Sequence, residues 1–375
     1  MSSFVRTMEL PTSGARTLPG RFFSSQRIFD LEMDRIFTQR WLCIGRSDRI
    51  AEPGAYLLQT VGPESIIVLR DKSGQPRAYY NVCRHRGTRM CEQKEGRFSE
   101  TIQCPYHAWT YALDGRLLAA PSSDTIDGFS KADYPLHRVG IAEWEGWLFI
   151  TLTPDGPSFD SAYAPVIGRF SRYGLPELSV ARRIDYDVKA NWKLIVQNYQ
   201  ECYHCAPVHP ALTKLSPPTS GEMDLHEGPF LGGYMTLVDG AETLSYSGRA
   251  CGLPVSGDLP DEDHRRVYYY SLFPNMLLSL HHDYVMAHTL WPLGPDRTHI
   301  ECEWLFNPKS LDNPAFDPGD GITFWDRTNR EDWHVCELSQ LGVSSRSYVP
   351  GPYSRRESIT AAFDQEVLRS LGEDA

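Results

Sequence analysis

The 375-residue sequence lacks several features that would assign its class at once. No run approaches the roughly 18–20 apolar residues that a membrane-spanning helix needs, and the start lacks the apolar core of a secretory signal. The net charge is −11, which argues against a nucleic-acid-binding protein. No Gly-x-Gly-x-x-Gly or flavin motif is found either. We therefore expect a cytoplasmic protein that oxidises NAD(P)H, if at all, through a partner.

Disulfides are also unexpected. The sequence has nine cysteines, an odd number, and in a reducing compartment such residues are usually buried thiols or metal ligands. The composition is otherwise that of a globular protein, with 41% hydrophobic and 12% aromatic residues. A chain of this length holds one large domain or two ordinary ones.

The hydrophobic pattern changes twice along the chain and indicates an α+β protein. Residues 1–44 contain a helical pattern that we expect to pack on the catalytic domain, residues 45–153 consist of short β-like runs, and residues 154–375 are mixed. In the last part the pattern predicts a helix over 191–205, a hairpin around His281–Asp283, and a helix over 321–342 closed by Gly342. The Gly-, Pro-, Ser- and Asp-rich segment 215–265 reads as a long functional or mobile loop.

Two short motifs each pair one cysteine with one histidine, Cys83-x-His85 and Cys104-x2-His107. A structural zinc site usually pairs like with like. One ligand of each kind per motif favours a [2Fe–2S] cluster with two thiolates on one iron and two imidazoles on the other, with zinc as the alternative. The stretch resembles the Rieske motif, although Ala108 stands where many members have glycine. The bystander cysteines in this interpretation are Cys43, Cys91, Cys251 and Cys302.

The stretch "ECYHCAPVHP", residues 201–210, offers a second set of ligands. On a helix over 191–205, Glu201 and His204 share one face, and Pro207 should end the helix so that His209 folds back. Two neutral imidazoles and a carboxylate leave open positions on iron(II), as in non-haem oxygenases. Thiolates from Cys202 and Cys205 would suit zinc better, so we interpret both as small buried residues.

The carboxylate of this second site must come from elsewhere in the chain. On the helix predicted over 321–342, Asp332 lies on a largely apolar face with Trp325, where an unpaired carboxylate would be costly. Its neighbour Glu331 shares a more polar face with Arg327. We therefore predict Asp332 as the third ligand, with Glu331 as the fallback.

The segments "NWKLIVQNYQECYHCAPVHP" and "NREDW" resemble the catalytic domain of Rieske non-haem iron oxygenases. This resemblance implies a helix-grip (START/Bet v 1-like) domain with a large antiparallel sheet, and a head-to-tail homotrimer. It also implies that Glu201 links His204 to His107 of the neighbouring subunit for electron transfer. Further implications are O2 as oxidant and a flavin/ferredoxin-type reductase that takes electrons from NAD(P)H.

The segment from Tyr268 to Thr298 resembles the glycine betaine, stachydrine and carnitine monooxygenase branch, which implies N-methyl hydroxylation with release of formaldehyde. Substrate-binding candidates are Phe273, Tyr284 and Trp291 as an aromatic cage, with Asn191, Tyr199 and Cys205 at the pocket border. One alternative is an aromatic-acid hydroxylase or dioxygenase with an anion clamp such as Arg249 or Arg265. Another is an electron carrier or sensor that binds ligand without turnover.

Overall fold

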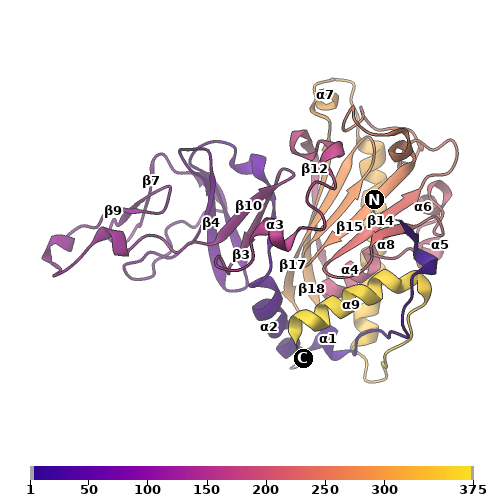
Figure 1. Ribbon diagram of the computed structural model, residues 1–375, viewed down its shortest axis with the longest axis horizontal. Coiled ribbons are helices and arrows are strands. Elements are labelled where there is room, and N and C mark those ends of the chain that lie inside the picture. Colours follow the sequence, from indigo (N-terminus) through magenta and orange to yellow (C-terminus); the bar gives the residue numbers. More distant parts are fainter. Residues whose placement is uncertain (1–3, 373–375) are drawn as a thin grey trace. The chain divides into compact units, whose positions relative to one another are not determined.

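The computed structural model in Figure 1 describes residues 4–372, and its contacts divide them into two units. One unit is residues 37–162, and the other joins residues 4–36 to residues 163–372. The smaller unit therefore extends beyond both boundaries predicted for it, at 45 and 153. Residues 1–3 and 373–375, the ends of the predicted first and last segments, lie outside the described residues. In the described part of the chain, no helix is long and apolar enough to cross a membrane.

The smaller unit is built from antiparallel β-sheets, as the short β-like runs predict. Its strands form three sheets, in the orders β10-β11-β2, β5-β4-β3-β6 and β7-β8-β9. The bounds are β2 Leu42–Arg46, β3 Ala55–Val61, β4 Glu64–Arg70, β5 Pro76–Tyr80, β6 Glu95–Arg97, β7 Thr101–Gln103, β8 Thr110–Ala112, β9 Leu117–Ala119, β10 Gly140–Trp144 and β11 Trp147–Thr151. The loop after β5 and the β7–β8 connection carry the two Cys–His motifs.

The larger unit contains an eight-stranded antiparallel sheet in the order β1-β13-β14-β15-β16-β17-β18-β12. The bounds are β1 Val5–Arg6, β12 Ser179–Val188, β13 Glu222–Leu225, β14 Phe230–Thr236, β15 Arg266–Leu272, β16 Met276–Leu280, β17 Val285–Gly294 and β18 Arg297–Phe306. The hairpin predicted around His281–Asp283 is β16–β17. The α+β class and the large antiparallel sheet are confirmed.

Strands β13 and β14 lie inside the segment expected to be one long loop, so that expectation was wrong. The glycines there serve close strand packing. A Cβ atom on Gly233 would lie 1.9 Å from the carbonyl oxygen of Glu222 on the paired strand. A glycine in a strand often marks such an approach of two backbones, and the composition alone reads it as a loop.

Helices α4 (Trp192–Tyr199), α8 (Gly319–Val343) and α9 (Ser358–Leu371) pack against this sheet (Figure 1). The long helix α8 turns one stripe inward at helical spacing. Its buried residues are Gly321, Phe324, Trp325, Thr328, Asn329, Trp333, Cys336 and Gln340. Gly342 lies inside α8 and Ser344 is the C-cap, so the predicted cap is corrected: Gly342 has no positive φ, which a glycine cap requires.

The helix predicted over 191–205 ends at Tyr199. The carboxylate of Glu201 accepts the backbone N–H groups of Tyr203 and His204, and this local bonding competes with helical hydrogen bonds. Pro207 does not end the helix but lies within the short helix α5 (Cys205–Val208). Its missing N–H costs nothing there, because first-turn N–H groups have no helical partner.

Helix α4 is held in place by the N-terminal helix α2 (Gln26–Glu32). The fully buried Glu32 forms an ion pair with Lys193 and accepts a 2.8 Å hydrogen bond from the indole of Trp192. Removal of one partner of such a buried ion pair strongly destabilises a fold, because the other charge stays buried without compensation. Residues 4–36 therefore support the element that leads directly into the second ligand set.

Candidate metal centres

The two Cys–His motifs of the smaller unit form two loops of the same geometry. The carbonyl of Cys83 accepts the N–H of Gly87 (3.0 Å), and the carbonyl of Cys104 accepts the N–H of Ala108 (3.1 Å). At this closing position φ is +76° for Gly87 and +55° for Ala108. Only glycine adopts positive φ without steric cost. Ala108 takes the same conformation under strain.

The four predicted cluster ligands differ in burial according to their chemical type. Cys83 and Cys104 are each 2% exposed, whereas His85 is exposed and His107 half-buried. The two imidazole rings meet edge to face, with centroids 4.7 Å apart, and the ring of His85 stacks on that of Trp109 with centroids 5.0 Å apart. Two buried thiols beneath two outer imidazoles fit a two-iron cluster in which each iron takes one kind of ligand.

A tyrosine supports one of the buried thiols. The hydroxyl oxygen of Tyr111 accepts the N–H of Arg84 (3.1 Å) and lies 3.5 Å from the sulfur of Cys83. Because its oxygen already accepts a hydrogen bond, the hydroxyl is free to donate its proton to the sulfur. Burial raises the pKa of the Cys83 thiol, and this hydrogen bond acts in the opposite direction. Hydrogen bonds to cluster sulfurs stabilise the reduced cluster and raise its potential.

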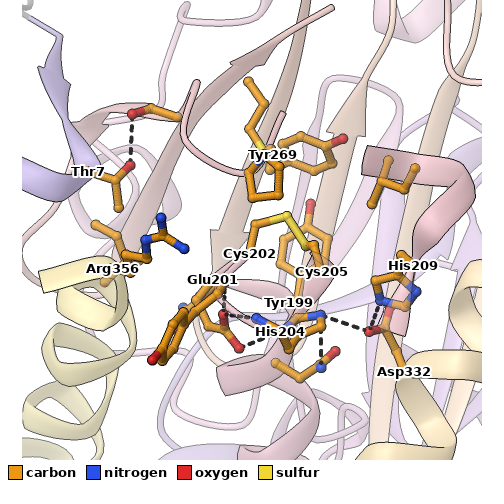
Figure 2. Close-up of a pocket in the computed structure, with 18 of the residues that line it drawn as sticks. Thr7, Tyr199, Glu201, Cys202, His204, Cys205, His209, Tyr269, Asp332 and Arg356 are labelled. Atoms are coloured by element: carbon orange, nitrogen blue, oxygen red, sulfur yellow. Dashed lines mark hydrogen bonds and ion pairs between the residues drawn. A yellow bond between two sulfur atoms is a disulfide. The ribbon is translucent and has the colours of Figure 1, made fainter. Parts of the chain in front are cut away.

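In the larger unit, His204, His209 and Asp332 converge, and their ligand atoms all lie within 4.8 Å of one another. His204 follows α4, His209 separates α5 from α6 (Pro210–Leu215), and Asp332 comes from α8. The Oδ1 atom of Asp332 is 2.8 Å from Nε2 of His209 and 3.2 Å from Nε2 of His204 (Figure 2). Two imidazoles and one carboxylate that occupy one face of a coordination sphere are the donor set of a mononuclear iron(II) site.

The far nitrogens of both histidines contact glutamates. Nδ1 of His204 is 2.6 Å from Glu201, and Nδ1 of His209 is 2.9 Å from Glu331. Such carboxylates fix the ring orientation and leave Nε2 to bind the metal. Glu331, the predicted fallback ligand, therefore contacts the Nδ1 side of His209, and it is also paired with Arg327 at 2.8 Å.

The charges at this site favour a bound cation. Burial alone would lower the pKa of His204, but the carboxylates of Asp332 and Glu201 outweigh it and raise that pKa to about 10. The pKa of His209 is raised in the same way, against burial, chiefly by Asp332. Burial would raise the pKa of Asp332, yet its hydrogen bonds to both histidines lower it. The raised pKa values keep protons on the histidines in the metal-free protein, and a divalent metal would displace these protons when it binds.

Two family models match this chain, one within each unit. A family model described as "Rieske [2Fe-2S] domain" matches residues 40–130, and one described as "Ring hydroxylating alpha subunit (catalytic domain)" matches residues 175–373. The chain belongs to the ring-hydroxylating oxygenase alpha subunits. The first domain accounts for a [2Fe–2S] cluster and the second implies a mononuclear iron, and the residues described above fit both groups.

Relatives of this alpha subunit cover nearly its whole length. It is 29% identical to a glycine betaine monooxygenase oxygenase subunit from Pseudomonas aeruginosa, over 96% of this chain and 91% of that protein. The corresponding subunit from Chromohalobacter salexigens is 31% identical, over 91% and 82%. A crystal structure of the quaternary ammonium Rieske monooxygenase CntA with L-carnitine superposes with a TM-score of 0.76 at 25% identity, covering 96% of this chain and 97% of that one.

A pocket of this alpha subunit opens onto the three ligands (Figure 2). One wall is aromatic: the ring of Tyr269 lies 6.1 Å from that of Tyr199 and 6.4 Å from that of Trp325. Tyr199 and Cys205 were predicted to border the pocket, and the structure places both in its lining. Trp325 was predicted only to share a helix face with Asp332, two helical turns away. That shared face was the one sign in the sequence that Trp325 borders the same pocket. Tyr269 was missed because it lies between two other tyrosines on one strand. Alternation puts it on the opposite face from both, but the sequence does not say which face borders the pocket.

The structure does not bring the other substrate-binding candidates to this pocket, and this corrects their assignment. Asn191 caps α4, and its side chain donates to a backbone carbonyl at 2.7 Å. Phe273 and Tyr284 are buried in the core, where the tyrosine hydroxyl donates to a backbone carbonyl at 2.6 Å. Trp291 lies on β17 away from the lining. The aromatic wall is formed by Tyr199, Tyr269 and Trp325 instead.

Cys202 and Cys205 form a disulfide, contrary to the expectation of free thiols. Their Cα atoms are 4.9 Å apart, because the chain turns after α4, and this separation lies within the range that a disulfide spans. The pair therefore lines the pocket as a cystine. The cysteines predicted to be bystanders are free: Cys43 and Cys302 are buried, and Cys91 and Cys251 are half-buried.

The predicted anion-clamp candidates are engaged elsewhere. Arg249 pairs with Glu242 at 3.1 Å and Arg265 pairs with Asp239 at 2.5 Å, and neither arginine lines the pocket. The lining instead contains an arginine that the sequence did not single out, Arg356. It lies just before α9, far along the chain from every motif.

Proposed function

We propose that this alpha subunit is the terminal oxygenase that hydroxylates an N-methyl group of a quaternary ammonium, betaine-type substrate. The observation that carries the proposal is the aromatic wall of Tyr199, Tyr269 and Trp325 in the pocket of His204 and Asp332. A quaternary ammonium ion cannot donate hydrogen bonds, and aromatic faces are the surfaces that attract it. The named activity of the full-length relatives supports the same substrate class.

The reaction balances as an N-demethylation. One oxygen atom of O2 enters the methyl group as a hydroxyl. The resulting hydroxymethylammonium loses its hydroxyl proton as its C–N bond breaks, the bonding electrons go to nitrogen, and a tertiary amine and formaldehyde are released. The other oxygen atom leaves as water, and NAD(P)H supplies two electrons through a flavin/ferredoxin-type reductase. When bound, the cluster passes on single electrons and the mononuclear iron activates O2. The apolar and aromatic lining holds the substrate and limits access of water to the reacting carbon.

Glu201 is proposed as the electron bridge between two copies of the chain. Its carboxylate contacts Nδ1 of His204 at 2.6 Å, which supplies one half of such a bridge. The other half would be His107 of the partner subunit in a head-to-tail homotrimer. A carboxylate has enough lone pairs to accept both imidazole N–H groups while it keeps its backbone contacts.

The test is formaldehyde release by the full chain with a working reductase. Glycine betaine, stachydrine, carnitine and choline are screened beside benzoate as an aromatic acid. We expect formaldehyde from at least one quaternary ammonium compound, in equal amount to the O2 consumed. Oxidation of benzoate without formaldehyde would support the aromatic-acid alternative instead. Absence of substrate-dependent O2 uptake with every compound would leave an electron carrier or sensor.

A further inference from the structure

The pocket that contains the iron ligands has a second end with different chemistry. Arg356 belongs to the 3-10 turn Arg355–Glu357 before α9 and is half-buried. It is the one arginine or lysine among the described residues that line the pocket. Figure 2 separates it clearly from His209 and Asp332, which lie on the other side of Glu201 in that view.

The guanidinium of Arg356 has no anionic partner. The adjacent Glu357 is turned away, because its carboxylate accepts the backbone and hydroxyl groups of Ser354 at 2.8 Å in a capping box. Within residues 4–372, no carboxylate pairs with Arg356 and no acceptor takes its N–H groups. Its one described contact is a cation–π interaction with the ring of Tyr203, at 5.6 Å.

Arg356 differs in this from many arginines of the same unit. The protein carries a net charge of −11, and many other arginines of the same unit are paired with acids. Examples are Arg297 with Asp187 and Arg330 with Asp326. A guanidinium that stacks on an aromatic ring keeps the N–H groups of its edge available, and that edge matches a carboxylate in a two-point hydrogen bond.

We propose that Arg356 is the carboxylate anchor of the substrate pocket and makes the enzyme select zwitterions over simple quaternary ammonium cations. This inference rests on the proposed function, because it assumes that the ammonium group lies against Tyr199, Tyr269 and Trp325. A molecule held at both ends presents its N-methyl groups to the iron ligands and its carboxylate to Arg356. Betaine-type substrates have both groups, whereas choline has a hydroxyl in place of the carboxylate.

The test compares Arg356→Gln with Arg355→Gln, a neighbouring arginine that is exposed and does not line the pocket. For each variant, KM is measured by steady-state kinetics and Kd by calorimetry. The ligands are the substrate that the formaldehyde screen identifies, glycine betaine and choline. We expect Arg356→Gln to raise KM and Kd for carboxylate-bearing substrates about ten- to hundredfold, the value of a charge-assisted hydrogen bond. The values for choline should change less than about threefold. Arg355→Gln should resemble the wild type with all compounds.

Charge reversal sharpens the test. Arg356→Glu should bind choline more tightly than the wild type does, because a carboxylate then faces a cation, and should lose glycine betaine. Equal losses for choline and betaine in Arg356→Gln, or the same loss in Arg355→Gln, would overturn the anchor. If no quaternary ammonium compound is oxidised but carboxylate ligands still bind through Arg356, the proposed function fails and the anchor stands. If betaine oxidation is unaffected by Arg356→Gln, the anchor fails and the function stands.

Discussion

The two proposed metal sites of this chain are assembled in opposite ways. The cluster ligands come from two equivalent loops within residues 83–107, so local backbone geometry alone nearly defines the site. The mononuclear ligands come from the turn at His204 and His209 and from Asp332 on α8, and only tertiary packing brings them together. A site built from loops that are close in sequence can therefore be recognised from a short motif. A site that joins one turn to a distant helix cannot, because its third ligand lies far along the chain.

The electrostatic surroundings of the histidines also differ. Burial, His85 and Arg86 lower the pKa of His107, in that order. At the other site Asp332 and Glu201 overcome burial and raise the pKa of His204. A positive neighbourhood favours the arrival of an electron, and a negative one favours the retention of a divalent ion.

Glu201→Gln is expected to have the largest effect on turnover. Its matched control is Glu331→Gln, because each glutamate contacts Nδ1 of a histidine of the proposed iron site. A merely orienting carboxylate contributes about ten- to hundredfold to metal affinity or activity. We expect Glu201→Gln to keep both iron centres and to lose more than about 100-fold in turnover, with slow electron transfer from the cluster to the iron in single-turnover experiments. Similar kinetics in the two variants would remove the bridging role.

Iron(II) binding at the mononuclear site should depend steeply on pH. The pKa of His204 in the metal-free protein is about 10, so at pH 7 its ring is protonated and must lose a proton to bind iron. Affinity should therefore rise about 100-fold between pH 6.5 and pH 8.5, tenfold per unit for one displaced proton. Metal titration of the iron-depleted protein at several pH values measures this. A flat profile would show that the carboxylates do not hold a proton on His204.

Tyr111→Phe should change the cluster and leave the iron site untouched. The variant loses the hydroxyl 3.5 Å from the sulfur of Cys83, which stabilises negative charge on the reduced cluster. A loss of about 1 kcal/mol of this stabilisation corresponds to a fall of roughly 40 mV in a one-electron potential. A redox titration followed by EPR measures the shift. An unchanged or higher potential would contradict the contact.

Ala108→Gly is expected to have the smallest effect. The φ of +55° at Ala108 is strained for alanine and free for glycine, and Gly87 already has the equivalent place in the other loop. We expect the variant to be more stable by about 1 kcal/mol or less, because glycine also gains entropy in the unfolded chain. Thermal unfolding monitors the change, and a lower Tm would mean that the methyl group contributes packing that outweighs the strain.

Much of this molecule could be predicted from residue patterns. The β-like runs of the smaller unit, the β16–β17 hairpin and the apolar stripe of α8 follow from period-2 and period-3.6 patterning. Asp332 could be singled out because a carboxylate on an apolar helix face needs a partner. The end of α4 at Tyr199 could not be predicted, because the side chain of Glu201 bonds its own turn. Tyr269 and Arg356 could not be placed either, because only tertiary packing brings β15 and the turn before α9 to the same pocket.

The metal content of the Asp332→Ala variant shows whether one chain holds two separate iron centres. The wild type should contain about three irons and two acid-labile sulfides per chain, two of the irons in the cluster. Asp332→Ala should contain about two irons and two sulfides and keep a full Rieske-type EPR signal on reduction. Full iron occupancy in this variant, or loss of the cluster together with the mononuclear iron, would contradict the account.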